Sequence, residues 1–381
     1  MGSEVFMKKI VLIGPVYPYK GGISHYTSLL YRELAKKYEP VMVSYKMQYP
    51  KLLFKKEQRD YRNDMFKVEP TYFWLHTANP FNIVKTAWKI RNMKADLVIL
   101  EWWHPYFAPC YWILSLFMGN VKKMFICHNV FPHERFPLDR FLTKMTLKWG
   151  DYFLVQSERD RKDLQSIRPD AAFRKVKHPT YNVFKSGKMK KETAREKLGL
   201  TQNEQVILFF GFVREYKGLK HLIRAMQKIH EELPQAKLLI AVDFGETKQE
   251  YLDQICQCQI ENCVQIHDEY IADHEVENFF LASNVVVLPY ETATQSGIAQ
   301  IAYGFERPVI TTNVGGLPEV VDDQNTGYLV EPGDSEGLAE KIIHYFKENK
   351  EDEFSANITK QKEKYLWDCL VDAMEDLGGW K

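Results

Sequence analysis

The 381-residue sequence lacks several features that would point directly to a function. Its formal net charge is only +1, so the overall charge gives no reason to expect a nucleic-acid partner. No apolar run reaches the roughly 18 residues of a membrane-spanning helix. The first residues also lack the charged and then apolar pattern of a secretory signal. The sequence therefore predicts a cytoplasmic protein.

Metal-binding patterns are missing as well. The six cysteines have no regular spacing, which is typical of reduced thiols rather than of a disulfide framework. Cys256 and Cys258 are separated by one residue, which does not match the usual zinc pairs, and Cys263 does not restore the pattern. The sequence contains neither an HExxH motif nor an Asp-x-Asp motif. We therefore expect no metal and no bound cofactor.

Length and composition predict a globular protein with two domains. The chain is 45% hydrophobic and 27% charged, and it is too long for one typical core. A polar, lysine-rich stretch at 179–191 has the composition of a linker. We expect domains at 1–185 and 186–358, followed by an amphipathic helix in the final segment 359–381.

Short apolar runs alternate with helical segments along the whole chain, which predicts an α/β fold with parallel sheets. The expected strands are 8–14, 40–45, 95–100, 123–127, 151–157, 205–210, 237–242, 264–267, 285–288 and 307–310.

The stretch 285–333 has the most informative pattern. An apolar strand at 285–288 is followed by a turn of small and polar residues, an apolar helix at 298–305 and a further strand. In such a unit the helix points its free N–H groups and its positive dipole end toward a ligand, which favours an anion. Two glycines at 315–316 would let backbone approach that ligand, and 325–333 predicts a tight, hairpin-like edge.

A second candidate for anion binding follows the strand at 205–210. Arg214 and Lys217 lie three residues apart on the turn after it, an arrangement that suits a diphosphate. The alternative is that both are ordinary surface ions. A further turn contains Gly21 and Gly22, but its spacing does not match a dinucleotide fingerprint.

The first half of the chain places polar and aromatic residues after two strands. His128 follows the strand at 123–127, and Glu134 lies shortly beyond it. The strand at 95–100 runs into Glu101, Trp102, Trp103 and His104. Ligands bind at the carboxyl ends of strands in open α/β sheets, so these residues are acceptor-side candidates.

Two segments raise the question of membrane contact. Residues 46–67 combine seven Lys or Arg and three Asp or Glu with interleaved aromatics, which fits either an anionic membrane surface or a solvated loop. Residues 111–118 are apolar on nearly all sides and predict either a buried helix or a lipid-facing patch. A lipid-linked acceptor and a place at the inner face of the cell membrane remain alternatives.

Three motifs, ERPVI at 306–310, GGLPEVV at 315–321 and NTGYLVEPGD at 325–334, resemble the donor-binding half of glycosyltransferase family 4. The resemblance implies the GT-B fold, in which two Rossmann-like domains face each other across a cleft and the last helix crosses back.

The resemblance also implies roles for particular residues. HNVFPHE at 128–134 resembles the histidine loop of the family, so His128 would contact the donor sugar. GFVREYKG at 211–218 resembles the phosphate clamp, although Phe212 stands where an Arg is usual. Gly21 and Gly22 would face the donor diphosphate, and Tyr270 and Ile271 would lie near the base.

The sequence departs from the family at two positions. The family has two Glu around the turn after 285–288, and Ala293 and Ile301 stand at their positions. Nearby groups that could take over their hydrogen bonds to the donor are Gln295, Ser296, Gly297, Gln300 and Glu319.

The hypothesis is a retaining, metal-independent hexosyltransferase that takes a sugar from a UDP- or GDP-linked donor in surface polysaccharide or glycolipid synthesis. A catalytically silent homologue that binds a nucleotide sugar or a partner protein is the main alternative, and an epimerase of the same fold is a third.

Overall fold

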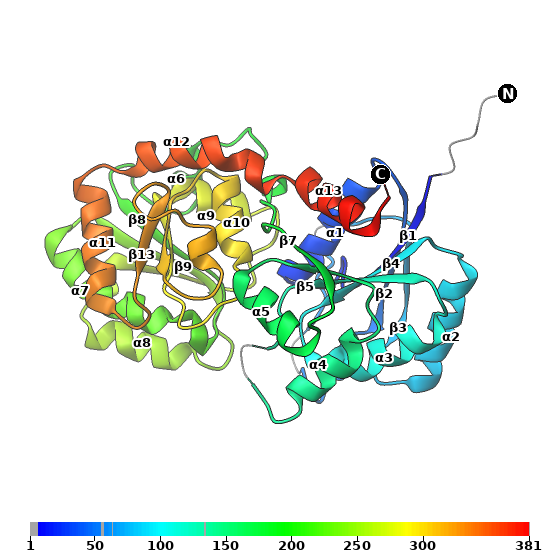
Figure 1. The fold of residues 1–381 in the computed structure, drawn as a ribbon. Helices are drawn as coiled ribbons and strands as arrows, with labels where there is room; N and C mark the ends of the chain where they lie inside the picture. Colours follow the sequence, from blue (N-terminus) through cyan, green and yellow to red (C-terminus); the bar gives the residue numbers. More distant parts are fainter. Residues whose placement is uncertain (1–6, 55–56, 63, 133–134, 381) are drawn as a thin grey trace. The chain divides into compact units, whose positions relative to one another are not determined.

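The structure is a computed structural model that describes residues 7–54, 57–62, 64–132 and 135–380. The chain forms two compact units (Figure 1). Unit 1 contains residues up to Val176 together with Trp367 onward, and unit 2 contains Lys177–Leu366. The first division comes earlier in the chain than the expected boundary at residue 185, and the second comes later than residue 358.

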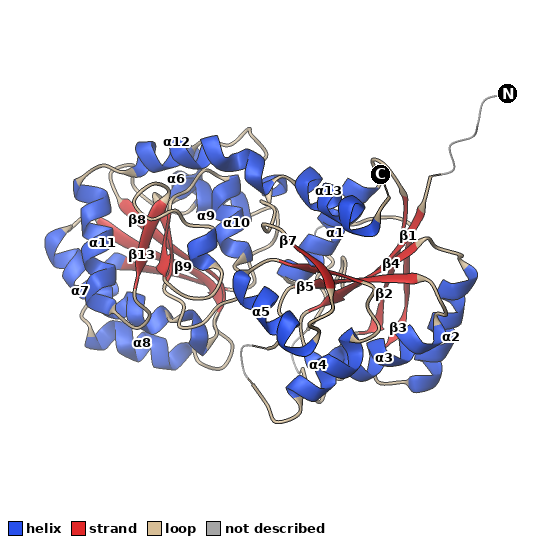
Figure 2. Ribbon diagram, in the orientation of Figure 1, coloured by secondary structure: helices blue, strands red, loops and turns tan. Residues whose placement is uncertain are grey.

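Unit 1 is built on a seven-stranded sheet with the order β3-β2-β1-β4-β5-β6-β7, in which all paired strands are parallel. The central strands are almost completely buried because helices cover both faces of the sheet (Figure 2). The strands are β1 (Lys9–Ile13), β2 (Glu39–Met47), β3 (Thr71–His76), β4 (Leu97–Trp102), β5 (Lys122–Cys127), β6 (Tyr152–Val155) and β7 (Ala172–Lys175).

The helices of unit 1 divide between the two faces of this sheet. One face shares a continuous apolar core with α2 (Pro80–Asn92), α3 (Ala108–Phe117), α4 (Asp139–Leu147) and α5 (Glu158–Ile167). The other face carries α1 (Gly22–Leu34) and α13 (Trp367–Gly378), which pack against each other. The Glu375 carboxylate on α13 accepts hydrogen bonds from Lys37 Nζ at 3.1 Å and from the Tyr38 hydroxyl at 2.7 Å. The final helix is therefore anchored to unit 1.

Unit 2 contains a six-stranded parallel sheet with the order β10-β9-β8-β11-β12-β13. Its strands are β8 (Gln205–Phe212), β9 (Ala236–Asp243), β10 (Val264–Asp268), β11 (Val285–Leu288), β12 (Val309–Thr312) and β13 (Gly327–Val330). Its α-helices are α6 (Lys191–Lys197), α7 (Leu219–Glu232), α8 (Lys248–Gln257), α9 (Val276–Ala282), α10 (Gly297–Gly304), α11 (Ser335–Lys347) and α12 (Glu351–Gln361).

Short 3-10 turns complete both units: η1 (Pro105–Phe107), η2 (Asn182–Phe184), η3 (Glu215–Lys217), η4 (Glu261–Cys263), η5 (Leu317–Glu319) and η6 (Lys362–Tyr365). The predicted α/β fold with two Rossmann-like halves is confirmed. None of the helices in the described part of the chain has the length and apolar character needed to span a bilayer.

Several local predictions were wrong. β3 and β7 were not expected, because both are edge strands in which all residues except Leu75 are exposed or half-buried, so neither has a buried apolar run. The predicted hairpin-like edge is instead the parallel pair β12 and β13, because η5 and its flanking turns carry the chain back to the starting edge of the sheet. The single helix expected near the C-terminus is interrupted at Leu366, which has an extended backbone with ψ 147°.

Candidate functional site

The strand order of unit 2 reverses beside β8. The chain proceeds from β8 to β9 on one side, and it later returns to β11 on the other side. Ligands in open parallel sheets bind outside the carboxyl ends of the strands at such a point, because the turns on either side diverge and leave room. A ligand site is therefore expected at the turns after β8, β11 and β12.

The turn after β8 carries two cations without a carboxylate partner. Arg214 is exposed and Lys217 is half-buried at the end of η3. Neither side chain forms an ion pair with a carboxylate in the part of the chain that the structure describes. Burial first, and then repulsion from Arg214, lower the pKa of Lys217 to about 8. An anion bound here would offset both effects on the pKa of Lys217.

Backbone hydrogen bonds fix the turns after β8 and β11 to each other. The Glu291 N–H donates to the Tyr216 carbonyl at 2.7 Å. The Glu291 carboxylate in turn accepts from Lys220 Nζ at 2.9 Å and lies 2.8 Å from His221 Nε2, so these groups compensate one another. Their hydrogen bonds to Glu291 lower the pKa of that carboxyl. The position of Lys217 is therefore set by a rigid frame.

The amino end of α10 lies beside Lys217. A Cβ placed on Gly211 would lie 3.3 Å from Lys217 Nζ and 3.5 Å from Cδ1 of Ile298, which is in the first turn of α10. Lys217 Nζ is 5.9 Å from the centre of the Tyr290 ring, and the hydroxyl of that residue is 3.5 Å from Ser296 Oγ. The structure thus brings Lys217 and the predicted helix end together within one unit, and Arg214 is near enough to lower the pKa of Lys217.

Ser296 is the N-cap of α10, since its Oγ accepts from the Ala299 N–H at 3.4 Å. Gly297 is the first residue of the helix and Gln295 precedes the cap. The dipole of the helix adds partial positive charge at this end, where the cations of the β8 turn also lie. Together they form an electropositive site with groups suited to phosphate oxygens.

Gln300 is unusual among the residues of α10. Its side chain is fully buried, yet neither its Nε2 nor its Oε1 has a hydrogen-bond partner in the described residues. A buried amide without partners costs about 1–3 kcal/mol, so such groups usually meet a ligand or water. The prediction that Gln300 binds the donor stays a prediction, but this cost is consistent with it.

The turn after β12 completes this edge of unit 2. Gly316 N–H donates to the Thr294 carbonyl at 3.0 Å, which joins it to the β11 turn. Gly315 has φ 56°, and a Cβ there would lie 1.7 Å from the Ala293 carbonyl oxygen, so only glycine fits. Ala293, at the position of one family Glu, is itself buried and supplies backbone contact instead. Glu319 ends the following turn η5.

The residues expected near a base lie farther along the same edge. Tyr270 follows β10, and its ring stacks on Phe212 with 5.9 Å between ring centres. Ile271 is buried. Phe212 therefore contributes an aromatic surface at the position where the family has an Arg, and this contact was not foreseen from the sequence.

Unit 1 has a separate polar cluster at the carboxyl ends of β4 and β5. His128 Nε2 lies 2.7 Å from Glu101 Oε2, and both residues are buried. An ionised Glu101 requires the proton of a neutral His128 to be on Nε2. Gly14 allows this packing, since a Cβ on it would lie 2.7 Å from Glu101 Cγ. Glu101 thus contacts the predicted catalytic histidine directly.

Two residues of this cluster were missed by sequence reasoning. The ring of Tyr26 meets that of His128 edge to face at 4.7 Å, and Gln156 Nε2 donates to the Tyr26 hydroxyl at 2.9 Å. They come from α1 and from the end of β6, far apart in the sequence. No motif links them, so only the fold could identify them.

The other candidates of unit 1 have different surroundings. Trp102 is fully buried and donates its indole N–H to the Val130 carbonyl, so it belongs to the core rather than to an accessible acceptor surface. Trp103 donates to the Tyr49 hydroxyl at 3.1 Å, and His104 caps η1. Gly21 and Gly22 begin α1 with open space beside both Cα atoms. Glu134 lies outside the described residues.

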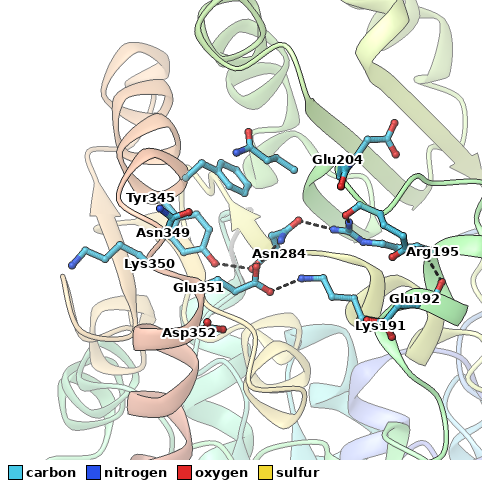
Figure 3. Close-up of a pocket in the computed structure, with 14 residues that line it drawn as sticks. Lys191, Glu192, Arg195, Glu204, Asn284, Tyr345, Asn349, Lys350, Glu351 and Asp352 are labelled. Atoms are coloured by element: carbon cyan, nitrogen blue, oxygen red, sulfur yellow. Dashed lines mark hydrogen bonds and ion pairs between the residues drawn. The ribbon is translucent and has the colours of Figure 1, made fainter.

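A cavity of about 490 Å³ lies at the opposite, amino edge of the unit 2 sheet (Figure 3). Its polar groups are occupied by one another. Glu351 Oε1 is 2.7 Å from both Lys191 Nζ and Arg307 Nη1, and Asn284 donates to Glu351 Oε2. Arg195 bonds three backbone carbonyls and the Asn284 side chain. The arrangement ties α6 and α12 to the sheet, and it is structural rather than a binding site.

The described residues contain no group of three or more His, Cys, Asp or Glu side chains placed to hold a metal ion. The candidate site of unit 2 consists of cations, a helix end and hydroxyl or amide groups. This set can neutralise and orient a phosphate-bearing ligand.

Comparisons with known proteins concern the family and the fold. Residues 190–365 match the family model described as glycosyl transferases group 1. An uncharacterized glycosyltransferase of Methanocaldococcus jannaschii is 30% identical over 180 residues, which are 46% of this chain and 45% of that protein. The chain matches less than half of the length of the curated relatives.

Solved structures extend the likeness to the whole fold. Sucrose-phosphate synthase of Thermosynechococcus elongatus has a TM-score of 0.74 at 18% identity, covering 97% of this chain and 98% of that one. HepE of Anabaena in complex with UDP-glucose has a TM-score of 0.75 at 17% identity, covering 97% and 99%. The fold is therefore that of GT-B glycosyltransferases, as the motifs predicted.

Removal of the Glu351 carboxylate is expected to destabilise unit 2. In Glu351→Ala, Lys191 and Arg307 lose their shared anionic partner while remaining largely buried, which should cost about 2 kcal/mol. Thermal or urea unfolding of the full chain measures this change. Glu353→Ala is the matched control, because Glu353 pairs with Lys350 at the surface and should change stability by less than about 0.5 kcal/mol. Equal effects would refute a structural role for the cluster.

Replacement of Lys217 is expected to stabilise the protein without ligand. Because folding lowers the pKa of Lys217 from 10.5 to about 8, the protonated Lys217 destabilises the folded state at neutral pH. Lys217→Met should therefore raise the free energy of unfolding by roughly 1–3 kcal/mol near pH 7. The gain should shrink as pH rises through 8, where the folded wild-type lysine loses its proton. Lys220→Met, which removes a cation paired with Glu291, should give no gain.

Proposed function

We propose that this protein is a glycosyltransferase that binds a nucleoside-diphosphate sugar in unit 2 and transfers the sugar to a glycan or lipid-linked acceptor. The observation that carries the proposal is the position of Lys217, which has no carboxylate partner among the described residues, beside the amino end of α10, with Arg214 near enough to repel it. The group 1 match over 190–365 and the UDP-glucose bound to HepE support a donor of this class.

The chemistry asked of this site is charge neutralisation. When the bond between sugar and diphosphate breaks, negative charge develops on the leaving phosphate. Lys217, Arg214 and the N–H groups of α10 are held in place before the ligand arrives, so they need little reorganisation. Transfer with retention of the anomeric configuration, and without a metal, is part of the proposal and follows from the resemblance to family 4.

Other residues would position the donor and the acceptor. Gln300 offers a buried amide to the sugar hydroxyls, and the Phe212 and Tyr270 pair offers an aromatic surface to the base. In unit 1, His128 would contact the transferred sugar, with Glu101 fixing its ring. A role in surface polysaccharide or glycolipid synthesis at the inner face of the membrane completes the proposal.

A catalytically silent protein that binds a nucleotide sugar is the second candidate. The specific observation that favours it is the presence of Ala293 and Ile301 where the family has two Glu. Loss of one charged hydrogen bond costs about 1.5–3 kcal/mol, or roughly ten- to a hundredfold in affinity or rate. The diphosphate site would remain, so binding alone does not separate the two candidates.

Titration calorimetry with UDP and GDP tests the diphosphate site. Lys217→Ala should weaken binding about ten- to a hundredfold, because a charge-assisted hydrogen bond is lost. Lys220→Ala is the matched control on the neighbouring helix and should change affinity by less than about threefold, since its charge is already compensated by Glu291. Affinity that is unchanged in both Lys217→Ala and Arg214→Ala would refute the site.

The pH dependence of the same binding follows from the pKa of about 8 for Lys217. The wild type should lose affinity as pH rises above 8, whereas Lys217→Arg should keep it because arginine stays protonated.

Transfer from a panel of radiolabelled nucleotide sugars to lipid extracts then separates the candidates. Binding without transfer or hydrolysis favours the silent protein, and release or isomerisation of the sugar without acceptor favours an epimerase.

A further inference from the structure

Three neighbouring helices of unit 1, α2, α3 and α4, form a layer whose inner face is fully used in the core. α2 packs on α3, and α3 packs on α4. Their inward side chains include Ile83, Ala87, Tyr111, Leu114 and Leu147, all in one buried cluster with the sheet. Any large apolar residue on the outer face is therefore additional to what the fold requires.

The outer face of this layer nevertheless carries large apolar side chains on all three helices. On α2, Phe81 is 88% exposed and Trp88 is 57% exposed. On α3, Leu116 is 45% exposed and Phe117 lies next to it. On α4, Phe141 is 65% exposed. We call these five residues the outer apolar row.

α3 shows most clearly that this face is not an ordinary solvated surface. The helix Ala108–Phe117 contains no charged residue. The positions that turn away from the core are Pro109, Trp112, Leu116 and Phe117, while Ile113 is partly buried against the core. A helix with one solvated face normally carries polar residues there, so this outward face is suited to a less polar environment.

Cations flank the outer apolar row, and carboxylates are almost absent. α2 contains Lys85, Lys89 and Arg91 and no acidic residue, and α4 contains Arg140 and Lys144. The one carboxylate on the three helices, Asp139, is buried and bound to Arg135. The layer is thus positively charged at its rim and apolar in its middle.

The other face of the same sheet provides an internal comparison (Figure 2). α1 and α13 expose no large apolar side chain among their described residues. The two lysines that follow α1 pair with carboxylates of these helices, Lys36 with Glu33 and Lys37 with Glu375. The apolar and positive character of α2, α3 and α4 is therefore not shared by the two helices on the other face of the sheet.

We propose that the outer face of α2, α3 and α4 lies on an anionic phospholipid bilayer. Aromatic and aliphatic side chains would enter the boundary between headgroups and acyl chains, and the flanking cations would contact phosphate groups. The charge pattern favours a lipid surface, because each lysine can extend its ammonium to a headgroup while its methylene stem stays on the apolar side. The inference rests on the proposed function in one respect only, which is that the bilayer would hold the lipid-linked acceptor.

Flotation of the full chain with lipid vesicles tests the surface without any nucleotide sugar. The protein should bind vesicles containing phosphatidylglycerol, bind vesicles of phosphatidylcholine alone much more weakly, and lose binding as salt is raised. The double variants Trp88→Ser with Phe141→Ser, and Lys85→Glu with Lys144→Glu, should each reduce binding on the order of tenfold or more. Leu366→Ser with Lys364→Glu, at exposed positions of unit 2, is the matched control and should bind as the wild type does.

Tryptophan fluorescence provides a second readout that does not depend on a loss of binding. Brominated lipid should quench part of the tryptophan emission when the protein binds vesicles. Trp88→Phe keeps an aromatic ring and should still bind, but the quenched part of the emission should be missing. The sequence contains eight tryptophans, so the difference between the two proteins isolates Trp88.

Equal flotation of all variants, absence of flotation on anionic vesicles, or quenching unaffected by Trp88→Phe would each overturn the proposal. Concentration-dependent dimers that dissociate in the Trp88 and Phe141 variant, without vesicle binding, would assign the face to a second copy of the chain instead. Failure of nucleotide binding with intact flotation would refute the proposed function and leave this surface in place.

Discussion

The structure of unit 2 depends on the backbone hydrogen bonds that join the turns at the carboxyl edge of its sheet. The bond from Glu291 to Tyr216 connects the turns after β8 and β11, and the bond from Gly316 to Thr294 connects those after β11 and β12. These bonds hold Lys217 beside the amino end of α10. The positive potentials of the lysine ammonium and of the helix dipole therefore add at one place. The alignment is built into the fold before any ligand arrives, which is the condition for electrostatic preorganisation.

This arrangement has a cost that explains much of the local chemistry. Lys217 is half-buried, is repelled by Arg214 and has no carboxylate partner in the part of the chain that the structure describes, and its pKa falls to about 8. Gln300 is buried with its amide unmatched. By contrast, the cluster around Glu351 satisfies its cations internally. Lys217 and Gln300 thus lie at the carboxyl edge of the sheet and the Glu351 cluster at the amino edge, as expected if ligand binding is confined to the carboxyl edge.

Sequence reasoning recovered the central strands and the edge strand β10, but it missed the two edge strands of unit 1, β3 and β7. β1, β4, β5, β8, β9 and β11 are buried on both faces and read as continuous apolar runs. β3 and β7 have mixed residues because an edge strand is partly solvated, so their pattern resembles a loop. For the site, the residue types and spacing of Arg214, Lys217 and Ser296 were sufficient to predict an anion site. The Phe212 and Tyr270 stack and the contacts of Tyr26 and Gln156 required the fold, because each joins segments far apart in the chain.

The sequence by itself determined the α/β class, the two-domain organisation and the turns that carry charge, because these follow from local periodicity and residue type. Only the tertiary structure decided which charged groups remain unpaired, since pairing depends on neighbours distant in sequence. Lys220 and Lys217 lie three positions apart, yet Lys220 pairs with Glu291 and Lys217 has no carboxylate partner among the residues described. The same reason applies to α3, whose apolar sequence fits a buried helix equally well, and whose outward face is known only once α2, α4 and the sheet have taken their places.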